Sequence, residues 1–162
     1  MFTLSIITVS DKGYSGERED LSGKMIEELT LGSFDVISKT IVPDEVGDIE
    51  DAIKSAVKAG ANLILTTGGT GFSKRDVTPE ATKAVIEKEA LGIAEAIRFN
   101  SLKYTSRAML SRGTAGICGS SLIVNLPGSP KAVKEALDFI LPVLPHGLEV
   151  LCGLAHDCAR KN

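Results

Sequence analysis

The chain has 162 residues and a formal net charge of −3, with 43% hydrophobic and 24% charged residues. This composition is typical of one globular domain and argues against a disordered chain. The acidic balance offers no support for a nucleic-acid partner, and no apolar run is long enough to span a membrane. The first apolar run also lacks the basic flank of a signal peptide. We therefore expect a single domain over residues 1–162 with no membrane partner.

The cysteines indicate where the protein works. Cys118, Cys152 and Cys158 are odd in number and widely spaced, which is typical of reduced thiols in a cytoplasmic protein. No CxxC or HxxxH spacing suits a zinc site. We expect Cys118 in the core, and His146 and His156 on a helix surface or in the tail.

Short apolar and β-branched runs alternate with helical patterns in the first half of the chain. They predict strands over Leu4–Val9, Phe34–Val42 and Asn62–Thr67. Apolar spacing predicts helices from the Asp20 cap to about Leu31 and over Asp48–Ala59, the latter ending at Gly60. The polar stretch Ser10–Asp20 is expected to be a loop.

Two proline signals start helices in the second half. Thr78 and Ser129 each precede a proline, as an N-cap precedes proline at the first helical position. The remaining pattern predicts helices over Pro79–Glu89, Gly92–Leu102, Pro130–Ile140 and Leu144–Leu154, and strands over Gly113–Cys118 and Ser121–Asn125.

Alternating strands and helices predict an α/β fold, a mainly parallel sheet with helices on both faces. Ligands in such sheets bind at the carboxyl ends of the strands. The loops at that end begin near Ser10, Pro43, Gly68 and Pro127, so four conspicuous loops belong to one rim.

The loop Gly68-Gly69-Thr70-Gly71 is rich in glycine directly after a strand. Glycine permits positive φ and close approach of a ligand to backbone N–H groups, which together can form an anion-binding nest. The sequence matches neither GxxxxGK[ST] nor GxGxxG, because Lys74 stands where the third glycine of the latter belongs. A plain tight turn remains an equal alternative.

Asp44 and Asp76 lie on two neighbouring rim loops beside this turn. Either could simply cap a helix or favour its dipole. Together, however, they form the oxygen-ligand pair with which Mg²⁺ commonly binds substrate phosphates. Carboxylates without a metal would repel a phosphate, so we expect a divalent cation between them.

Other rim residues fit an anionic ligand. Basic side chains can pair with phosphate oxygens, or can simply be solvated surface; those near the rim are Lys74, Arg75, Arg107, Arg112 and Lys131. Ser10-Asp11 ends the first strand, and Ser129-Pro130 places a helix N-terminus at the rim, where anions bind favourably. Capping alone is an equally good explanation for both.

Taken together, these segments resemble the molybdopterin adenylyltransferase family, which includes bacterial molybdenum-cofactor enzymes and the G domain of gephyrin. The segments that carry the resemblance occur in order along nearly the whole chain: TVSD (8–11), VPDE (42–45), TTGGTG (66–71), RDVTPE (75–80), SR (111–112), AG (115–116) and NLPGSP (125–130).

The resemblance implies an α/β/α sandwich, a homotrimer, and Mg²⁺-dependent transfer of AMP from ATP to the terminal phosphate of molybdopterin. The product would pass to a molybdenum insertase. Asp44 and Asp76 correspond to the family's catalytic, metal-binding aspartates. The nucleotide site would comprise Ser10, Asp11, Gly68, Gly69, Thr70 and Gly71, and the molybdopterin site Arg75, Ser111, Arg112, Ala115, Gly116, Pro127, Gly128 and Ser129.

Two alternatives remain at this point. The chain could bind molybdopterin as a carrier or scaffold without adenylylating it. It could also be a nucleotide-dependent transferase or oxidoreductase on a Rossmann-like sheet, although the missing GxGxxG disfavours that class. The sequence leaves the role of the loop Lys12–Glu19 open.

Overall fold

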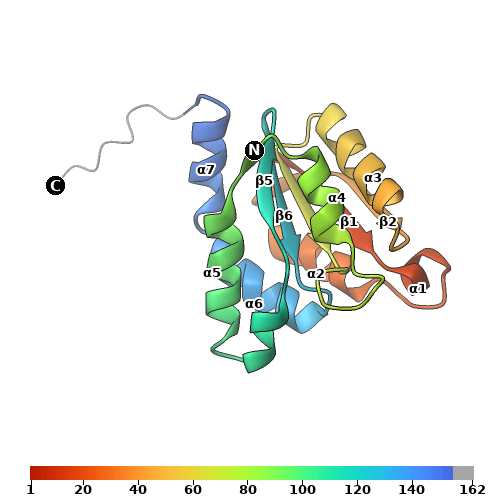
Figure 1. Cartoon of the computed structure of the whole chain (residues 1–162). Coiled ribbons are helices and arrows are strands. Elements are labelled where there is room, and N and C mark those ends of the chain that lie inside the picture. The colour runs from red at the N-terminus through yellow and green to blue at the C-terminus, as the bar shows by residue number, and fades with distance from the viewer. Residues whose placement is uncertain (155–162) are drawn as a thin grey trace.

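The computed structural model describes residues 1–154 and contains one six-stranded sheet in the order β2-β1-β3-β6-β5-β4 (Figure 1). Strands β1 (Phe2–Val9), β2 (Phe34–Val42), β3 (Leu63–Thr67) and β6 (Ser121–Leu126) pair in parallel. Strands β5 (Ala115–Cys118) and β4 (Lys88–Glu89) extend the sheet with antiparallel pairs. The predicted α/β sheet is thus confirmed, while Cys158 and His156 lie outside the described residues.

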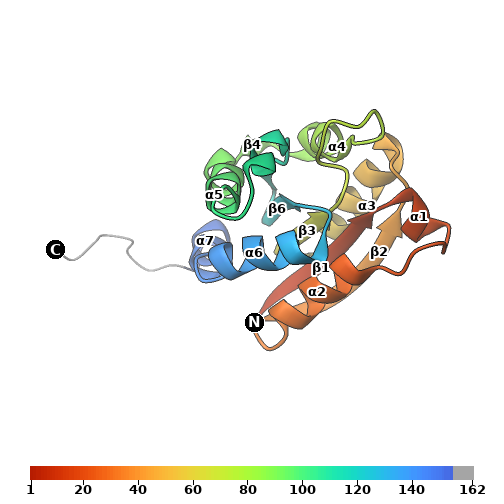
Figure 2. The same cartoon turned by 90° about the horizontal axis from the view of Figure 1, so that it is seen from below.

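Helices cover both faces of the sheet (Figure 2). One face carries α2 (Leu21–Thr30), α5 (Leu91–Ser101), α6 (Pro130–Ile140) and α7 (Leu144–Leu151). The other carries α3 (Val46–Lys58) and α4 (Thr78–Val85). This is the expected three-layer α/β/α sandwich.

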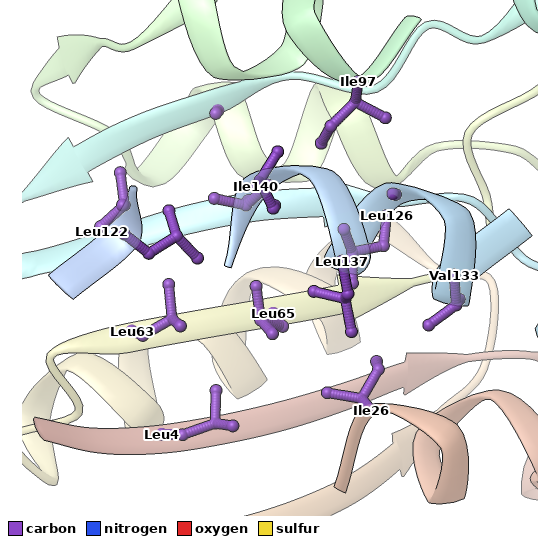
Figure 3. Close-up of a cluster of buried hydrophobic side chains, with 14 of the residues drawn as sticks. Leu4, Ile26, Leu63, Leu65, Ile97, Leu122, Leu126, Val133, Leu137 and Ile140 are labelled. Carbon is purple, nitrogen blue, oxygen red and sulfur yellow. The ribbon is translucent and has the colours of Figure 1, made fainter. Parts of the chain in front are cut away.

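Strand periodicity divides the core between these two faces. In β3, Leu63 and Leu65 point to the α6 side and Ile64 to the α3 side, and all three are fully buried. Figure 3 shows the larger cluster, in which Leu65 lies between strand neighbours and Leu137 of α6. Buried on both sides, the central strands are continuous apolar runs, which is why the sequence signalled them clearly.

Several element boundaries differ from the sequence predictions. The loop after β1 contains a short helix, α1 (Asp11–Tyr14), and α3 begins at Val46 instead of Asp48. Helix α4 ends at Val85, because Lys88–Glu89 pairs with β5 as an edge strand. A 3₁₀ helix, η1 (Ser106–Leu110), follows α5, and α7 ends at Leu151.

Smaller predictions hold. Asp20 caps α2 by accepting from the Gly23 N–H at 2.8 Å, and His146 lies on the exposed surface of α7. Cys118 is partly buried against the core, and within residues 1–154 both cysteines are free thiols. No helix in the described part of the chain is long and apolar enough to cross a membrane.

Leu137 should be a main support of the larger core. Leu137→Ala leaves a cavity among fully buried neighbours, so we expect the free energy of unfolding to fall by about 3 kcal/mol. Urea denaturation followed by circular dichroism measures this. Lys134→Ala, on the exposed side of the same helix, removes only an exposed ion pair and should change stability by about 0.5 kcal/mol or less. Equal effects for the two variants would contradict this packing.

Candidate functional site

The carboxyl ends of the parallel strands β1, β2, β3 and β6 meet at one edge of the sheet, and the chain segments that follow them lie side by side there (Figure 1). Ser10, Asp44, Gly68 and Gly128 stand in these four segments, and all four border one cavity. The prediction that four loops share a rim is therefore confirmed.

The glycine turn after β3 lies in close contact with the end of β1 and the start of α4. Gly68 and Gly69 have φ of 97° and 65°, which favours glycine. A Cβ on Gly68 would lie 2.3 Å from the Val9 carbonyl oxygen, and one on Gly69 would lie 2.3 Å from Thr78 Oγ1. Thr78 fixes the turn with two hydrogen bonds. Its hydroxyl donates to the Gly68 carbonyl at 2.9 Å, and its N–H donates to the Gly69 carbonyl at 3.0 Å. These positions require glycine for space as well as for conformation.

Asp44 is held by a reciprocal pair of hydrogen bonds with Asp11. The Asp11 N–H donates to Asp44 Oδ2 at 2.8 Å, and the Asp44 N–H donates to Asp11 Oδ1 at 3.0 Å. The other carboxylate oxygen, Oδ1 of Asp44, faces the turn, 3.4 Å from where a Cβ on Gly69 would stand. The ends of β1 and β2 together therefore aim this carboxylate at the glycine turn.

Asp76 approaches the same turn from the other side. Its Oδ2 accepts from the Ser73 N–H at 2.9 Å and would lie 2.9 Å from a Cβ on Gly71. Neither aspartate is a helix cap: the N-caps of α3 and α4 are Glu45 and Val77, and neither makes a side-chain capping bond. The capping alternative for Asp44 and Asp76 is therefore wrong.

Two serines, by contrast, do cap helices. Ser10 accepts from the Gly13 N–H at 3.0 Å, and Ser129 accepts from the Ala132 N–H at 3.2 Å. Thr78, predicted as an N-cap, is instead the first residue of α4. The hydroxyls of Ser10 and Ser129 are thus engaged by their own helices, although both residues border the cavity at the rim.

Burial and hydrogen bonds shift the pKa values of the paired aspartates in opposite directions. Burial raises the pKa of Asp44, and the nearby charges of Asp11 and Asp76 add to that rise. The pKa of Asp11 is lowered by its hydrogen bond with Arg75 and by the N–H of Asp44. A half-buried carboxylate that resists ionisation would gain from a cation placed beside it.

The two arginines of the sequence motifs, Arg75 and Arg112, both use their side chains for hydrogen bonds within the protein. Arg75 donates to both oxygens of Asp11 at 2.9 and 3.1 Å and to Glu45 at 2.7 Å. Arg112 donates to the carbonyls of Gly71 at 2.7 Å and Asp76 at 2.6 Å, and pairs with Glu80. In this structure these arginines hold the loops that carry Asp44 and Asp76.

Two cavities lie on either side of the glycine turn. The carboxylate cavity has a volume of about 510 Å³, and its border includes Ser10, Asp20, Asp44, Gly68, Gly69, Asp76, Gly128 and Ser129. The apolar cavity has a volume of about 260 Å³, and its border includes Thr70, Gly71, Ile97, Ser101, Leu110, Ser111, Pro127, Ala132 and Glu135. The turn therefore contributes its first two residues to one cavity and its last two to the other.

Some predicted site residues lie elsewhere. Asp11, Arg75 and Arg112 border neither cavity. Their hydrogen bonds instead hold the loops that carry Asp44 and Asp76. Ala115 is fully buried in the core, and a Cβ on Gly116 would lie 2.6 Å from the Ile86 side chain. The structure thus places Ala115 and Gly116 in packing positions, and neither borders either cavity.

Sequence reasoning missed polar residues that border the cavities. Arg18 and Glu19 belong to the loop whose role was open, and they border the carboxylate cavity. Ser101 and Glu135 border the apolar cavity from α5 and α6. For Ser101 and Glu135, the sequence did offer a signal, because each is a polar residue on the buried face of an amphipathic helix.

The side chains at the turn supply only some of the ligands that a hard cation needs. Asp44 and Asp76 offer carboxylate oxygens, the ligands that Mg²⁺ prefers. Within residues 1–154, however, no group of three or more His, Cys, Asp or Glu side chains could hold a metal ion. Two carboxylates without a complete protein cage fit a Mg²⁺ that shares its remaining ligands with substrate phosphates and water.

With this geometry in view, comparison with known proteins identifies the family. Residues 5–146 match the family described as a probable molybdopterin binding domain. The chain belongs to the molybdopterin adenylyltransferase family. The molybdopterin adenylyltransferase of Helicobacter pylori strain J99 is 41% identical, with 98% of this chain and 93% of that protein covered. That of Pyrococcus furiosus is 44% identical, with 91% and 90% covered.

A solved structure supports the same conclusion. The molybdopterin biosynthesis enzyme MoaB from Thermus thermophilus superposes with a TM-score of 0.89 at 48% identity. The match covers 94% of this chain and 98% of that one. The family resemblance seen in the sequence motifs is therefore confirmed over nearly the full length.

The glycine turn offers a direct test of its geometry. Gly69→Ala adds a methyl group 2.3 Å from Thr78 Oγ1 at a positive φ, so we expect a lower melting temperature and weaker ATP binding. Gly92→Ala is the matched control, because a Cβ there meets open space on helix α5 and should be neutral or slightly stabilising. Calorimetry that finds Gly69→Ala as tolerated as Gly92→Ala would contradict the turn geometry.

Arg75 should affect the titration of both paired aspartates, and that of Asp11 most. Its hydrogen bonds and then its charge lower the pKa of Asp11, and its charge opposes the rise that burial causes in the pKa of Asp44. Arg75→Met should therefore raise both pKa values, that of Asp11 more, as measured by carboxyl ¹³C NMR titration. The folded Asp11 has a pKa below its ordinary value of 3.8. Its contribution to stability is therefore present above that value and lost as pH falls through the folded pKa. The stability gap between wild type and Arg75→Met should accordingly shrink below about pH 4; a gap independent of pH would contradict the assignment.

Proposed function

We propose that this chain transfers AMP from ATP to the terminal phosphate of molybdopterin and releases pyrophosphate, in the biosynthesis of the molybdenum cofactor. Relatives that share 41% and 44% identity over most of their length carry the name molybdopterin adenylyltransferase. The observation that carries the proposal is the convergence of Asp44 and Asp76 on one glycine turn.

The reaction needs no covalent enzyme intermediate. An ionised oxygen of the molybdopterin phosphate attacks the α-phosphorus of ATP, a new P–O bond forms, and the bond to the bridging oxygen of pyrophosphate breaks. The oxygen is already anionic, so no side chain has to remove a proton. Catalysis of this kind is mainly positioning and stabilisation of charge, which agrees with a site built of carboxylates and backbone N–H groups.

Asp44 and Asp76 would hold Mg²⁺ at the turn. The ion would neutralise charge that develops on the phosphate oxygens and the leaving pyrophosphate. The role of the chain's own residues is to fix the two carboxylates: Asp11 holds Asp44 through the reciprocal hydrogen bonds, and Ser73 holds Asp76. Fixed groups of this kind stabilise a transition state without having to reorganise during the reaction.

The two cavities suggest how the substrates divide between them. The carboxylate cavity borders Gly68, Gly69 and the N-terminus of α6 at Ser129, a setting that favours phosphates of the nucleotide. The apolar cavity, bordered by Ser111 and Pro127, has aliphatic walls that suit a flat ring such as a pterin. Thr70 and Gly71 would then lie near the point where the reacting groups meet.

The family resemblance adds the cellular setting to the proposal. In it, the enzyme works as a homotrimer in the cytoplasm and passes adenylylated molybdopterin to a molybdenum insertase.

A turnover assay tests the function. Purified protein is mixed with molybdopterin, ATP and Mg²⁺, and the pterin product is weighed by mass spectrometry. We expect a product heavier by one AMP, and a loss of about 100-fold or more in kcat for Asp44→Asn or Asp76→Asn. Asp35→Asn, an exposed carboxylate on β2 outside both cavities, should leave kcat unchanged.

The same assay separates the alternatives. Tightly bound but unmodified pterin would overturn the transferase and favour a carrier. Full turnover by both Asp44→Asn and Asp76→Asn would overturn the assignment of these carboxylates even if the product is the expected one.

A further inference from the structure

The border of the carboxylate cavity is acidic, with one exception. Within the described part of the chain, Arg18 is the single basic residue on that border. The acidic residues on the same border are Glu19, Asp20, Asp44 and Asp76. Phosphates that enter this cavity would therefore meet mostly like charge, and one divalent ion would neutralise only part of the charge of a triphosphate. A further cation is needed, and Arg18 stands where it can supply one.

The guanidinium of Arg18 is free to bind a ligand. The side chain is exposed, and within residues 1–154 it makes no hydrogen bond or ion pair. The two acids that follow it in the chain are held by other groups. Glu19 pairs with Lys24, and Asp20 accepts from the Gly23 N–H at 2.8 Å. A solvated surface arginine is the ordinary alternative, and the experiment below tests it.

The backbone around Arg18 is fixed even though its side chain is free. Its N–H donates to the Lys12 carbonyl on α1 at 3.1 Å, which closes the loop between α1 and α2. On the other side, the Leu21 N–H donates to the Glu19 carbonyl at 3.1 Å, where α2 begins. The loop therefore holds Arg18 at the border of the cavity and leaves the long side chain to reach a ligand.

The geometry of the proposed reaction indicates where the pyrophosphate leaves. In an in-line displacement, the attacking and leaving oxygens lie on opposite sides of the phosphorus. The molybdopterin phosphate would come from the apolar cavity, which α5 borders with Ile97 and Arg98. Figures 1 and 2 both show α5 on one side of the molecule, and α1 with the loop that follows it on the other. The leaving pyrophosphate would extend away from α5, toward the loop that carries Arg18.

We propose that Arg18 binds the β- and γ-phosphates of ATP and the pyrophosphate that they become. A guanidinium presents a planar fork of N–H donors that matches two phosphate oxygens. When the bond from the α-phosphorus to the bridging oxygen breaks, its electron pair moves onto that oxygen, and negative charge gathers on the pyrophosphate. Arg18 stabilises that charge by hydrogen bonds and transfers no proton, because the guanidinium stays protonated.

The inference rests on the proposed function, which supplies ATP, but it concerns binding and can be measured without turnover. It also differs from the metal site in its prediction for ligands. Asp44 and Asp76 would act on the α-phosphate at the turn, whereas Arg18 would distinguish a nucleotide that carries further phosphates from one that does not.

The test is isothermal titration calorimetry in Mg²⁺ buffer with three probes: ATP, inorganic pyrophosphate and AMP. Arg18→Met should weaken the binding of ATP and of pyrophosphate about 10-fold, as expected for the loss of charge-assisted hydrogen bonds. AMP lacks the β- and γ-phosphates, so its binding should change by less than about 2-fold. Arg18→Lys should fall between the wild type and Arg18→Met, because it keeps the charge and loses the planar fork.

Lys12→Met is the matched control. It removes the same charge from the start of the same loop, outside both cavities, and leaves in place the backbone carbonyl that holds Arg18. It should bind all three probes as the wild type does, and melting curves should show that the variants are folded.

Three results would overturn the inference. Unchanged binding of ATP and pyrophosphate by Arg18→Met would make Arg18 a solvated surface residue. An equal loss in Lys12→Met would show that the overall charge of the loop matters and that Arg18 makes no contact. An equal loss for AMP and ATP would place Arg18 on the α-phosphate or the nucleoside.

A kinetic readout separates this inference from the proposed function. In the adenylyl-transfer assay, Arg18→Met should raise KM for ATP while KM for molybdopterin stays the same. If the wild type binds ATP and pyrophosphate with the expected dependence on Arg18 but forms no adenylylated product, the proposed function fails and the inference stands. If the product forms but Arg18→Met shows wild-type KM for ATP and wild-type kcat, the inference fails and the function stands.

Discussion

The site depends on the close approach of backbones at the end of β3. The space beside Gly68 is filled by the Val9 carbonyl, where a Cβ would lie at 2.3 Å, and the Cα of Gly68 lies 3.4 Å from where a Cβ on Gly128 would stand. The segments after β1, β3 and β6 therefore meet backbone to backbone, with no side chain between them. This contact brings two cavities to either side of one turn. A residue larger than glycine at position 68 would push these loops apart. It would also separate the side chains of the two cavities, which must act together.

The charges around the turn explain why we propose that a cation takes part. Arg75 and Arg112 are cations that contact the loops, but each is already paired with a carboxylate and holds a loop in place. Asp44 and Asp76 both face the turn, and burial together with neighbouring acids raises the pKa of Asp44. Bringing the phosphates of ATP to this edge would add further repulsion. A divalent cation bound jointly by protein and substrate relieves both effects, so it would bind with the substrate instead of staying in a complete protein cage.

The sequence predicted the architecture well because its central strands are buried on both faces and therefore appear as uninterrupted apolar runs. It also brought Asp44, Asp76 and the glycine turn to one rim, since parallel strands end at the same edge. It missed β4, because a two-residue edge strand has no periodicity of its own and is defined only by pairing with β5. The role of Arg112 could not be foreseen either, since its contacts with Gly71 and Asp76 join loops about 40 residues apart in the chain. Ser101 and Glu135 lie within ordinary helical patterns, and only the packing of α5 against α6 shows that they face a shared cavity.

The central claim is that Asp44 and Asp76 hold one metal ion against the phosphates of ATP at the glycine turn. Crystals grown with Mn²⁺ in place of Mg²⁺ and a non-hydrolysable ATP analogue would test it through the anomalous scattering of manganese. We expect a single strong peak between the two carboxylates, with phosphate oxygens completing the coordination and the triphosphate over Gly68 and Gly69. A nucleotide bound at the turn with no metal beside either aspartate would contradict the account.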